Sequence, residues 1–415
     1  MRRLPFFVSG FLLVTGLWGC GKDEVKKIVG PDTAGAQQEV GLAEQALATG
    51  DVAGANQHFK DALAKDAGNA PANLGAGVTE IYLLQGDPDV SDLIDLFNNN
   101  VGGGLPTGPR PGLAPPGLRP ALPMRTSSRA SEALARMNLT PRARYDFIGG
   151  AGALLQFLLR SVADPPPIST IQQVIREKVL PELAYAEARM NSVETNPSFV
   201  WILPPSVTGL ASDLEIDIAD VLLLDALINT VQGTLEIPIA YNVSVPSYSY
   251  VNVDSLFTDS GSDWGTLYAD GSLLLSDAHG DWLTAIARAE AAVASIQAES
   301  DDQSDDLIPI AALGTSSDIA EFLSGLSDLH AALSGPVYVR FTNRYAAADS
   351  ERVDAGVFFT NPVTDLRTIA PDHTFDLNHQ FVPDAPLNFP HPTFHGILPD
   401  LTNDRIRYLL GIPSI

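Results

Sequence analysis

The sequence predicts a mainly α fold, in which a helical hairpin packs on a larger helical bundle and a small irregular region with short strands follows. Two observations predict the helices. From about Ala34 apolar residues recur every three or four positions, and the run after Asp217 is apolar on nearly all sides, as at the centre of a bundle. A third observation predicts the strands, because beyond residue 335 the pattern changes to short runs such as VYVRF.

The chain begins with the features of a secretory signal. Two arginines precede an apolar run from Leu4 to Leu17, which is shorter than the ~20 residues that span a membrane. Small residues and the sole cysteine follow this run. We therefore expect residues 1–19 to be a signal peptide and residues 20–33 to be a polar tether.

The run Leu17-Trp18-Gly19-Cys20 resembles the cleavage box of bacterial lipoproteins. The resemblance implies that Cys20 carries acyl chains, which would anchor the protein stably in a membrane. Gly21, directly after the cysteine, is typical of lipoproteins exported to the outer membrane. The implied location is the bacterial outer membrane, with the periplasmic and the surface face both open.

Charge and motifs exclude several classes of function. The chain carries 50 acidic and 25 basic residues, a formal net charge of −25, which argues against nucleic acid as a partner. It has no Gly-x-Ser-x-Gly elbow and no dinucleotide-binding glycine fingerprint, and its one thiol is assigned to lipidation. We expect a protein that is not an enzyme and has no cofactor.

Residues 34–98 resemble a tetratricopeptide repeat and the start of a second one. A Gly50-Asp51 turn joins two helical runs, and Ala55, Phe59 and Ala62 follow at the spacing of a face that packs on a partner helix. Such repeats bind protein segments in a groove between successive inner helices. The resemblance implies a groove lined by four residues: Ala43, Ala46, Gly77 and Glu80.

Residues 99–128 are rich in Pro and Gly and predict a linker, and residues 129–335 predict a helical bundle domain. The runs 198–203 and 213–217 alternate as in a hairpin, and Pro181 should kink or split the helix around it. In the helix after Asp217 the polar residues form one narrow stripe: Asp220, Asp225, Asn229, Gln232 and Glu236.

Residues 336–415 predict an irregular C-terminal region with strands at VYVRF and AGVFFT and a final helix at TNDRIRYLLGI. This region is similar to uncharacterised secreted bacterial lipoproteins, a likeness that implies no activity. Histidines gather there and could hold a transition metal, although their spacing matches no known signature: His373, His379, His391 and His395.

Two further patterns leave alternatives open. Aromatic residues could stack a sugar ring or an apolar ligand, or simply pack in the core: Trp201, Tyr241, Tyr248, Tyr250, Trp264 and Tyr268. The acidic loop around Asp259, Asp263 and Asp270 offers calcium ligands, but a solvated loop fits as well, and residues 301–306 read as a solvated linker.

Together these patterns predict a membrane-anchored envelope lipoprotein that acts as a non-catalytic adaptor for a protein partner through its repeat-like helices. The first alternative is a lipoprotein that binds a glycan or small solute at the aromatic residues. The second is a metal-handling lipoprotein that uses the histidine-rich tail.

Overall fold

The computed structural model describes residues 31–93, 168–244, 263–300, 305–309, 313–343, 346–375 and 381–410. Over these residues the fold is mainly α, with three small two-stranded antiparallel sheets, which confirms the predicted fold class. The predicted signal peptide, Cys20 and the Pro/Gly-rich linker lie outside them.

Three short helices begin the described chain: α1 (Thr33–Ala48), α2 (Val52–Lys65) and α3 (Ala70–Leu84). Each follows a residue whose side chain accepts a hydrogen bond from a backbone N–H of the first turn: Asp32, Asp51 and Asn69. Gly50 adopts a φ of 77° in the turn between α1 and α2, a conformation that glycine takes without strain. Ala55, Phe59 and Ala62 are fully buried, as the helical spacing predicts.

The next helical stretch runs from residue 168 to residue 194 without a break: α7 (Ile168–Val174), the π-helical turn η1 (Ile175–Val179) and α8 (Leu180–Glu194). Pro181 lies in the first turn of α8, directly after η1. Proline removes one backbone donor and crowds the preceding turn, and the wider π-helical turn accommodates it. The helix is therefore not split at Pro181.

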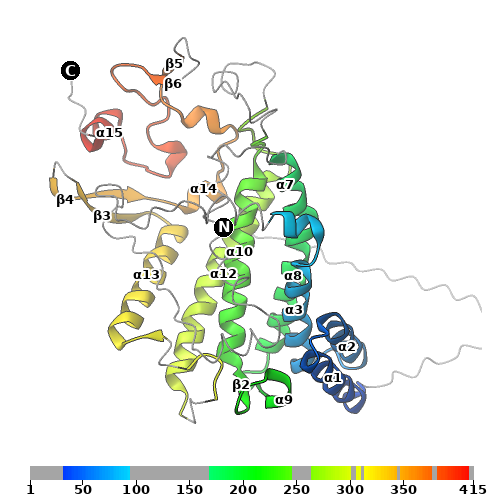
Figure 1. Cartoon of the computed structure of the whole chain (residues 1–415). Coiled ribbons are helices and arrows are strands. Elements are labelled where there is room, and N and C mark those ends of the chain that lie inside the picture. The colour runs from blue at the N-terminus through cyan, green and yellow to red at the C-terminus, as the bar shows by residue number, and fades with distance from the viewer. Residues whose placement is uncertain are drawn as a thin grey trace, which may run out of the picture.

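Two long antiparallel helices form the centre of the molecule: α10 (Ile218–Ala240) and α12 (Gly271–Ala298). Gly233 of α10 approaches α12 so closely that a Cβ atom there would lie 2.9 Å from the Ala278 carbonyl oxygen and from Trp282. α8 also packs on α10, and α3 packs on α8. The longer helices thus pack in chain order, α1, α2, α3, α8, α10 and α12, with α10 and α12 side by side (Figure 1).

The hairpin predicted before α10 is confirmed. β1 (Val200–Leu203) pairs antiparallel with β2 (Leu214–Asp217), and the one-turn helix α9 (Pro205–Thr208) lies between them. Asp217 then caps α10 through a capping box with Asp220. By length and composition α10 could cross a membrane, but half of its most apolar stretch is buried inside the protein, as in the core helix of a bundle.

The C-terminal region packs against α12 at the end where α10 finishes (Figure 1). Its longer elements are α13 (Ser316–Ser334), β3 (Val337–Asn343), β4 (Ala346–Val353), α14 (Gly356–Thr360) and α15 (Asn403–Leu410). Its shorter elements are η3 (Leu366–Ile369), β5 (His373–Phe375), β6 (Phe381–Pro383) and η4 (Phe394–Gly396). The predicted strand at VYVRF and the final helix are confirmed.

The predicted strand at AGVFFT is wrong, because this segment forms helix α14. Gly356 sits against the end of α13, where a Cβ atom would lie 2.2 Å from the Leu333 carbonyl oxygen. Phe358 stacks on Tyr241, and the adjacent Phe359 stacks on His279. Consecutive residues of a strand point to opposite faces, whereas a helical turn brings both rings onto the end of the bundle.

Candidate functional site

The polar stripe of α10 faces neighbouring helices rather than water. Four of its residues follow at spacings of four, three and four, which places them on one helix face: Asp225, Asn229, Gln232 and Glu236. Together with polar residues of α8 and α12 they form what we call the acidic seam: Glu187 and Glu194 of α8, these four residues of α10, and Asp277, Asp281 and Arg288 of α12.

One end of the seam is organised by a guanidinium group. The side chain of Asp225 is 0% exposed, and its Oδ2 lies 3.1 Å from Nε of Arg288. The same guanidinium lies 2.6 Å from Oε2 of Glu194, and Asn229 donates to Oδ1 of Asp225 at 3.1 Å. We call these four residues the arginine layer. A buried carboxylate needs such a counter-charge, because desolvation of an unpaired charge is very costly.

The other end of the seam contains acids and an amide. Gln232 donates to Oε2 of Glu187 at 3.4 Å, and the carboxyl groups of Glu236 and Asp281 are hydrogen-bonded to each other. We call these four residues the carboxylate layer, and Asp277 lies beside it. Within the described residues no lysine, arginine or histidine forms an ion pair with any of these carboxyl groups.

The seam holds more acceptors than donors. Apart from the contacts of Glu236 with Asp281 and of Glu194 with Asp225, five of its buried oxygen atoms meet no hydrogen-bond donor among the described residues: Glu194 Oε1, Asn229 Oδ1, Gln232 Oε1, Glu236 Oε2 and Asp281 Oδ2. Such atoms are rare in folded proteins, because each one loses its hydrogen bonds to water on burial. A carboxyl proton shared between Glu236 and Asp281, or between Glu194 and Asp225, supplies a donor within each pair. Asn229 Oδ1 and Gln232 Oε1 are then the oxygens left for another donor or a cation.

Electrostatics in the carboxylate layer favour uptake of positive charge. Burial, reinforced by Asp281 and Asp277, raises the pKa of Glu236 to about 9. Burial, reinforced by Glu187 and Asp277, raises the pKa of Asp281 to about 7. In the arginine layer burial also raises the pKa of Asp225, while the hydrogen bond from Arg288 opposes the shift. The carboxyl groups therefore bind protons more tightly than exposed carboxyl groups do.

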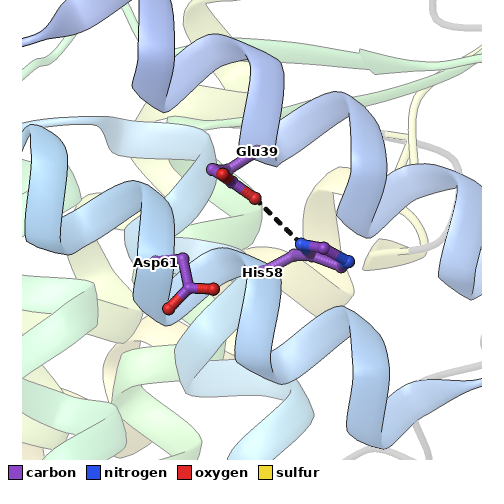
Figure 2. Close-up of side chains that lie close together, drawn as sticks. All are labelled: Glu39, His58 and Asp61. Atoms are coloured by element: carbon purple, nitrogen blue, oxygen red, sulfur yellow. Dashed lines mark hydrogen bonds and ion pairs between the residues drawn. The ribbon is translucent and has the colours of Figure 1, made fainter.

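A second group of potential metal ligands joins α1 to α2 (Figure 2). Glu39 of α1 meets Nδ1 of His58 at 2.9 Å, and Asp61 lies one turn further along α2. Lys65 already lies 2.6 Å from the other Glu39 oxygen, and the hydrogen bonds from Lys65 and then His58 lower the pKa of Glu39. The negative charge of Glu39 is balanced by Lys65. We interpret this group as an ion-pair network between two helices.

A third group lies next to the hairpin: Glu215, Asp305 and Asp306. The backbone of Glu215 bonds to Asp305 and to Leu307, so residues 305–307 extend the hairpin, and Asp306 is buried. The expectation that residues 301–306 form a solvated linker is therefore wrong for 305 and 306. The physical reason is that the β2 edge supplies backbone partners that a free linker would find only in water.

The four residues expected to line a repeat groove lie in the packed interior of the α1–α3 region. Ala43 is fully buried, Ala46 is half-buried in the core, and a Cβ atom on Gly77 would lie 2.5 Å from Cε of Met190. Glu80 is 2.5 Å from Lys60. These side chains support helix packing and, except for Glu80, offer little surface to a partner.

The described members of the predicted aromatic patch do not gather in one place. Trp201 packs edge-on against Phe59 and donates to Oε1 of Glu44, whereas Tyr241 lies at the other end of α10. A helix of 23 residues is about 34 Å long. Tyr268 lies near Tyr241, where its ring faces the Arg176 guanidinium. Trp264 is half-buried at the same end, and Tyr248 and Tyr250 lie outside the described residues.

Of the four tail histidines, two come together. The rings of His391 and His395 are 4.5 Å apart, in a turn and not in a regular α-helix, which agrees with the presence of Pro392. His373 faces the Pro371 carbonyl oxygen at 2.7 Å, and His379 lies outside the described residues. Within the described part of the chain no metal-ligand group of three includes any of these histidines. In the acidic loop Asp270 forms an ion pair with Arg176, and Asp259 is not described.

Of the acidic seam, only the residues on α10 could be recognised from the sequence. The stripe on α10 was visible, but the acids of α8 and α12 look like residues of solvated helix faces. A usable signal was present, because Asp277, Asp281 and Arg288 follow at multiples of the helical repeat, as do Glu187 and Glu194.

Comparison of the chain with protein-family models, with curated proteins and with solved structures gave no match.

Proposed function

We propose that this protein is a non-catalytic, ligand-binding lipoprotein of the bacterial envelope, anchored through Cys20, and that its helical bundle binds a positively charged ligand on the acidic seam. One observation carries the proposal: six carboxyl groups of the seam share one guanidinium within the described residues, and the buried amide oxygens of Asn229 and Gln232 there meet no donor. A bound cation supplies the charge and the contacts that these atoms lack.

The strongly acidic composition supports a cationic ligand. A net charge of −25 raises the local concentration of cations around the protein and repels anions. A neutral glycan is a poorer fit, because the aromatic residues that would stack on it lie at two ends of α10.

The test is thermal unfolding of the full-length mature protein in detergent, at fixed ionic strength, with a panel of ligands. Calcium, magnesium, spermidine, an arginine-rich peptide and neutral oligosaccharides would be compared. At least one cation should raise the Tm saturably, since a ligand bound only by the native state stabilises it by mass action. If none of the cations raises the Tm, the proposal is wrong.

An adaptor for a protein partner is the second candidate. The observation that favours it is an apolar surface on β1, where Val200 is 51% and Ile202 is 44% exposed beside the α1–α3 region. In-cell crosslinking of the tagged protein followed by mass spectrometry should recover an envelope protein with wild type and lose it with V200S/I202S. Recovery of the same protein with both forms would exclude this surface.

A further inference from the structure

The acidic seam contains two pairs of acids, one in each layer, and each pair joins two neighbouring helices. In the arginine layer Glu194 of α8 is hydrogen-bonded to Asp225 of α10. In the carboxylate layer Glu236 of α10 is hydrogen-bonded to Asp281 of α12. Because α8 and α12 both run antiparallel to α10, a step of seven residues leads from one layer to the other on all three helices. Seven residues are about two helical turns, so the layers lie about 10 Å apart.

A hydrogen bond between two acid side chains requires a proton. An ionised carboxylate only accepts hydrogen bonds, so one member of each pair is protonated when the bond forms. Burial raises the pKa of all four groups, and the bond within each pair adds to the rise for the glutamate and opposes it for the aspartate. In both pairs the glutamate is therefore the donor and the aspartate is the acceptor.

Within the described residues a cation lies beside the first pair but not beside the second. Arg288 contacts both acids of the arginine layer. Burial and then the charge of Asp225 raise the pKa of Glu194 to about 7, while Arg288 opposes the shift. For Glu236, burial and two aspartates of α12 raise the pKa to about 9. The carboxylate layer therefore holds its proton further into the alkaline range than the arginine layer does.

Charged groups of all three helices surround the pair in the carboxylate layer. Its acidic neighbours are Glu187 of α8, Asp225 of α10 and Asp277 of α12. Arg176 lies towards the C-terminal end of α10, where it pairs with an aspartate outside the seam, and His279 of α12 contacts a carbonyl oxygen of α13. The acids oppose ionisation of the pair, and these two basic groups have partners elsewhere.

We propose that Glu236 and Asp281 form a proton switch between α10 and α12, in which one shared proton holds the two helices together and its transfer to a base in alkaline solution loosens their contact. The arginine layer is the fixed end of the seam, because Arg288 still balances Glu194 and Asp225 when their own proton leaves. The proton switch needs no cationic ligand and so goes beyond the proposed function.

The helix contact at the proton switch is tight and dry. A Cβ atom on Gly233 of α10 would lie 2.9 Å from the Ala278 carbonyl oxygen and from Trp282 of α12. Glu236 is 7% exposed, so water screens its charge poorly. When the shared proton leaves, two carboxylates repel each other there and can be hydrated only if water enters between the helices. Trp282 adjoins Asp281 and therefore reports on this contact.

Infrared spectroscopy of the full-length mature protein, in a detergent without carbonyl groups, tests the shared proton directly. Wild type should show a band of protonated carboxyl groups at about pH 7, and the band should be lost above about pH 10. E236Q should weaken this band at the lower pH. Glu290→Gln, on α12 but outside the seam, is the matched control and should leave the band unchanged. A band in E236Q as strong as that of wild type would overturn the proposal.

Urea unfolding between about pH 5 and about pH 9 tests the link to stability. The raised pKa of Glu236 gives stability that is complete below pH 4.5 and is lost as the pH rises towards about 9. E236Q keeps a donor for Asp281 and has no proton to lose. Its folding equilibrium constant relative to wild type should therefore rise at least about tenfold across this range, whereas a constant ratio would contradict the proton switch. Other buried acids titrate in both proteins and cancel.

Tryptophan fluorescence tests whether the helices loosen. The difference between the spectra of wild type and Trp282→Phe gives the emission of Trp282. Between about pH 7 and about pH 10 this emission should shift to longer wavelength as water enters, and the shift should be absent in the E236Q background. Unchanged emission while the carboxyl band is lost would show that the proton leaves without moving the helices, and would overturn the proton switch. Cation binding is measured separately by thermal unfolding, so the proton switch and the proposed function can fail independently.

Discussion

Asp225 shows how a single side chain constrains this protein. It is fully buried in the centre of the bundle, and its charge is balanced by Arg288, which also contacts Glu194. A buried ion pair adds little net stability compared with an apolar pair, but loss of one partner leaves an uncompensated charge. Replacing Asp225 or Arg288 alone should therefore lower the stability of the protein more than replacing both together.

We predict that Arg288→Gln lowers the free energy of unfolding by about 3 kcal/mol, because Asp225 and Glu194 lose their counter-charge. The double variant D225N/R288Q should recover much of this loss. Urea unfolding followed by circular dichroism measures both. As a control, Arg407→Gln removes an ion pair with Asp404, whose side chain is 85% exposed, and should cost less than about 1 kcal/mol. Equal costs for the two arginine variants would contradict the prediction.

Asp220 provides a prediction on pH. Burial holds its pKa well above the ordinary value of 3.8, and the carboxylates of Asp217, Asp306 and Glu299 add to the shift, while a hydrogen bond from the Asp217 N–H opposes it. A raised folded-state pKa gives stability that is complete below pH 3.8 and is lost as the pH rises towards the folded value.

Asp220→Asn removes this titration and keeps an oxygen acceptor for the Asp217 N–H. The variant should therefore gain stability relative to wild type as the pH rises from about 4 to about 7. Urea unfolding of both proteins across this range gives the difference in free energy. A difference that stays constant with pH would show that Asp220 does not titrate as inferred.

At the scale of elements, close helix contacts depend on glycine. Gly75 of α3 faces the Phe59 ring of α2, and a Cβ atom there would lie 2.4 Å from the ring, which is fully buried and has no room to move. Gly280 of α12 has no atom within 4 Å of its Cβ position. The two glycines therefore have opposite roles, although both lie within helices.

We predict that Gly75→Ala destabilises the protein by about 1–3 kcal/mol, because the methyl group forces α2 and α3 apart. Gly280→Ala should instead stabilise it by up to ~1 kcal/mol, because alanine has the higher helix propensity and meets no neighbour. The midpoints of urea unfolding of the two variants and of wild type measure both effects. A Gly75→Ala midpoint equal to or above that of wild type would mean that packing around Phe59 is looser than the structure shows.

The elements that local chemistry specifies could be predicted, and those that depend on distant partners could not. The boundary between α1 and α2 follows from Gly50 and the Asp51 cap, and the β1–β2 hairpin follows from alternation. By contrast β4 is a run of Ala, Asp and Ser that has no strand pattern of its own and pairs because β3 lies beside it. For the same reason AGVFFT, apolar enough for a strand, becomes α14 against the end of α13.

At the scale of the whole molecule, anchoring remains a prediction from the sequence. Cys20→Ser removes the site of acylation, and the protein should move from the membrane fraction to the soluble envelope fraction, since several buried acyl chains hold a lipoprotein stably. Cell fractionation and immunoblotting measure this, with wild type processed in parallel. A variant that stays in the membrane fraction after a high-salt wash would disprove lipid anchoring at this residue.

The sequence by itself determined the fold class, the helix caps, the buried face of α2 and the central position of α10, because each depends on residues close together in the chain. It also revealed the polar stripe on α10. Only the tertiary structure decided what this stripe meets. Glu187, Glu194, Asp281 and Arg288 come from helices up to about 100 residues apart, and antiparallel packing aligns them at a seven-residue interval. Burial then raises the pKa of Glu236 and Asp281, so that these carboxyl groups hold protons more tightly than they would in water.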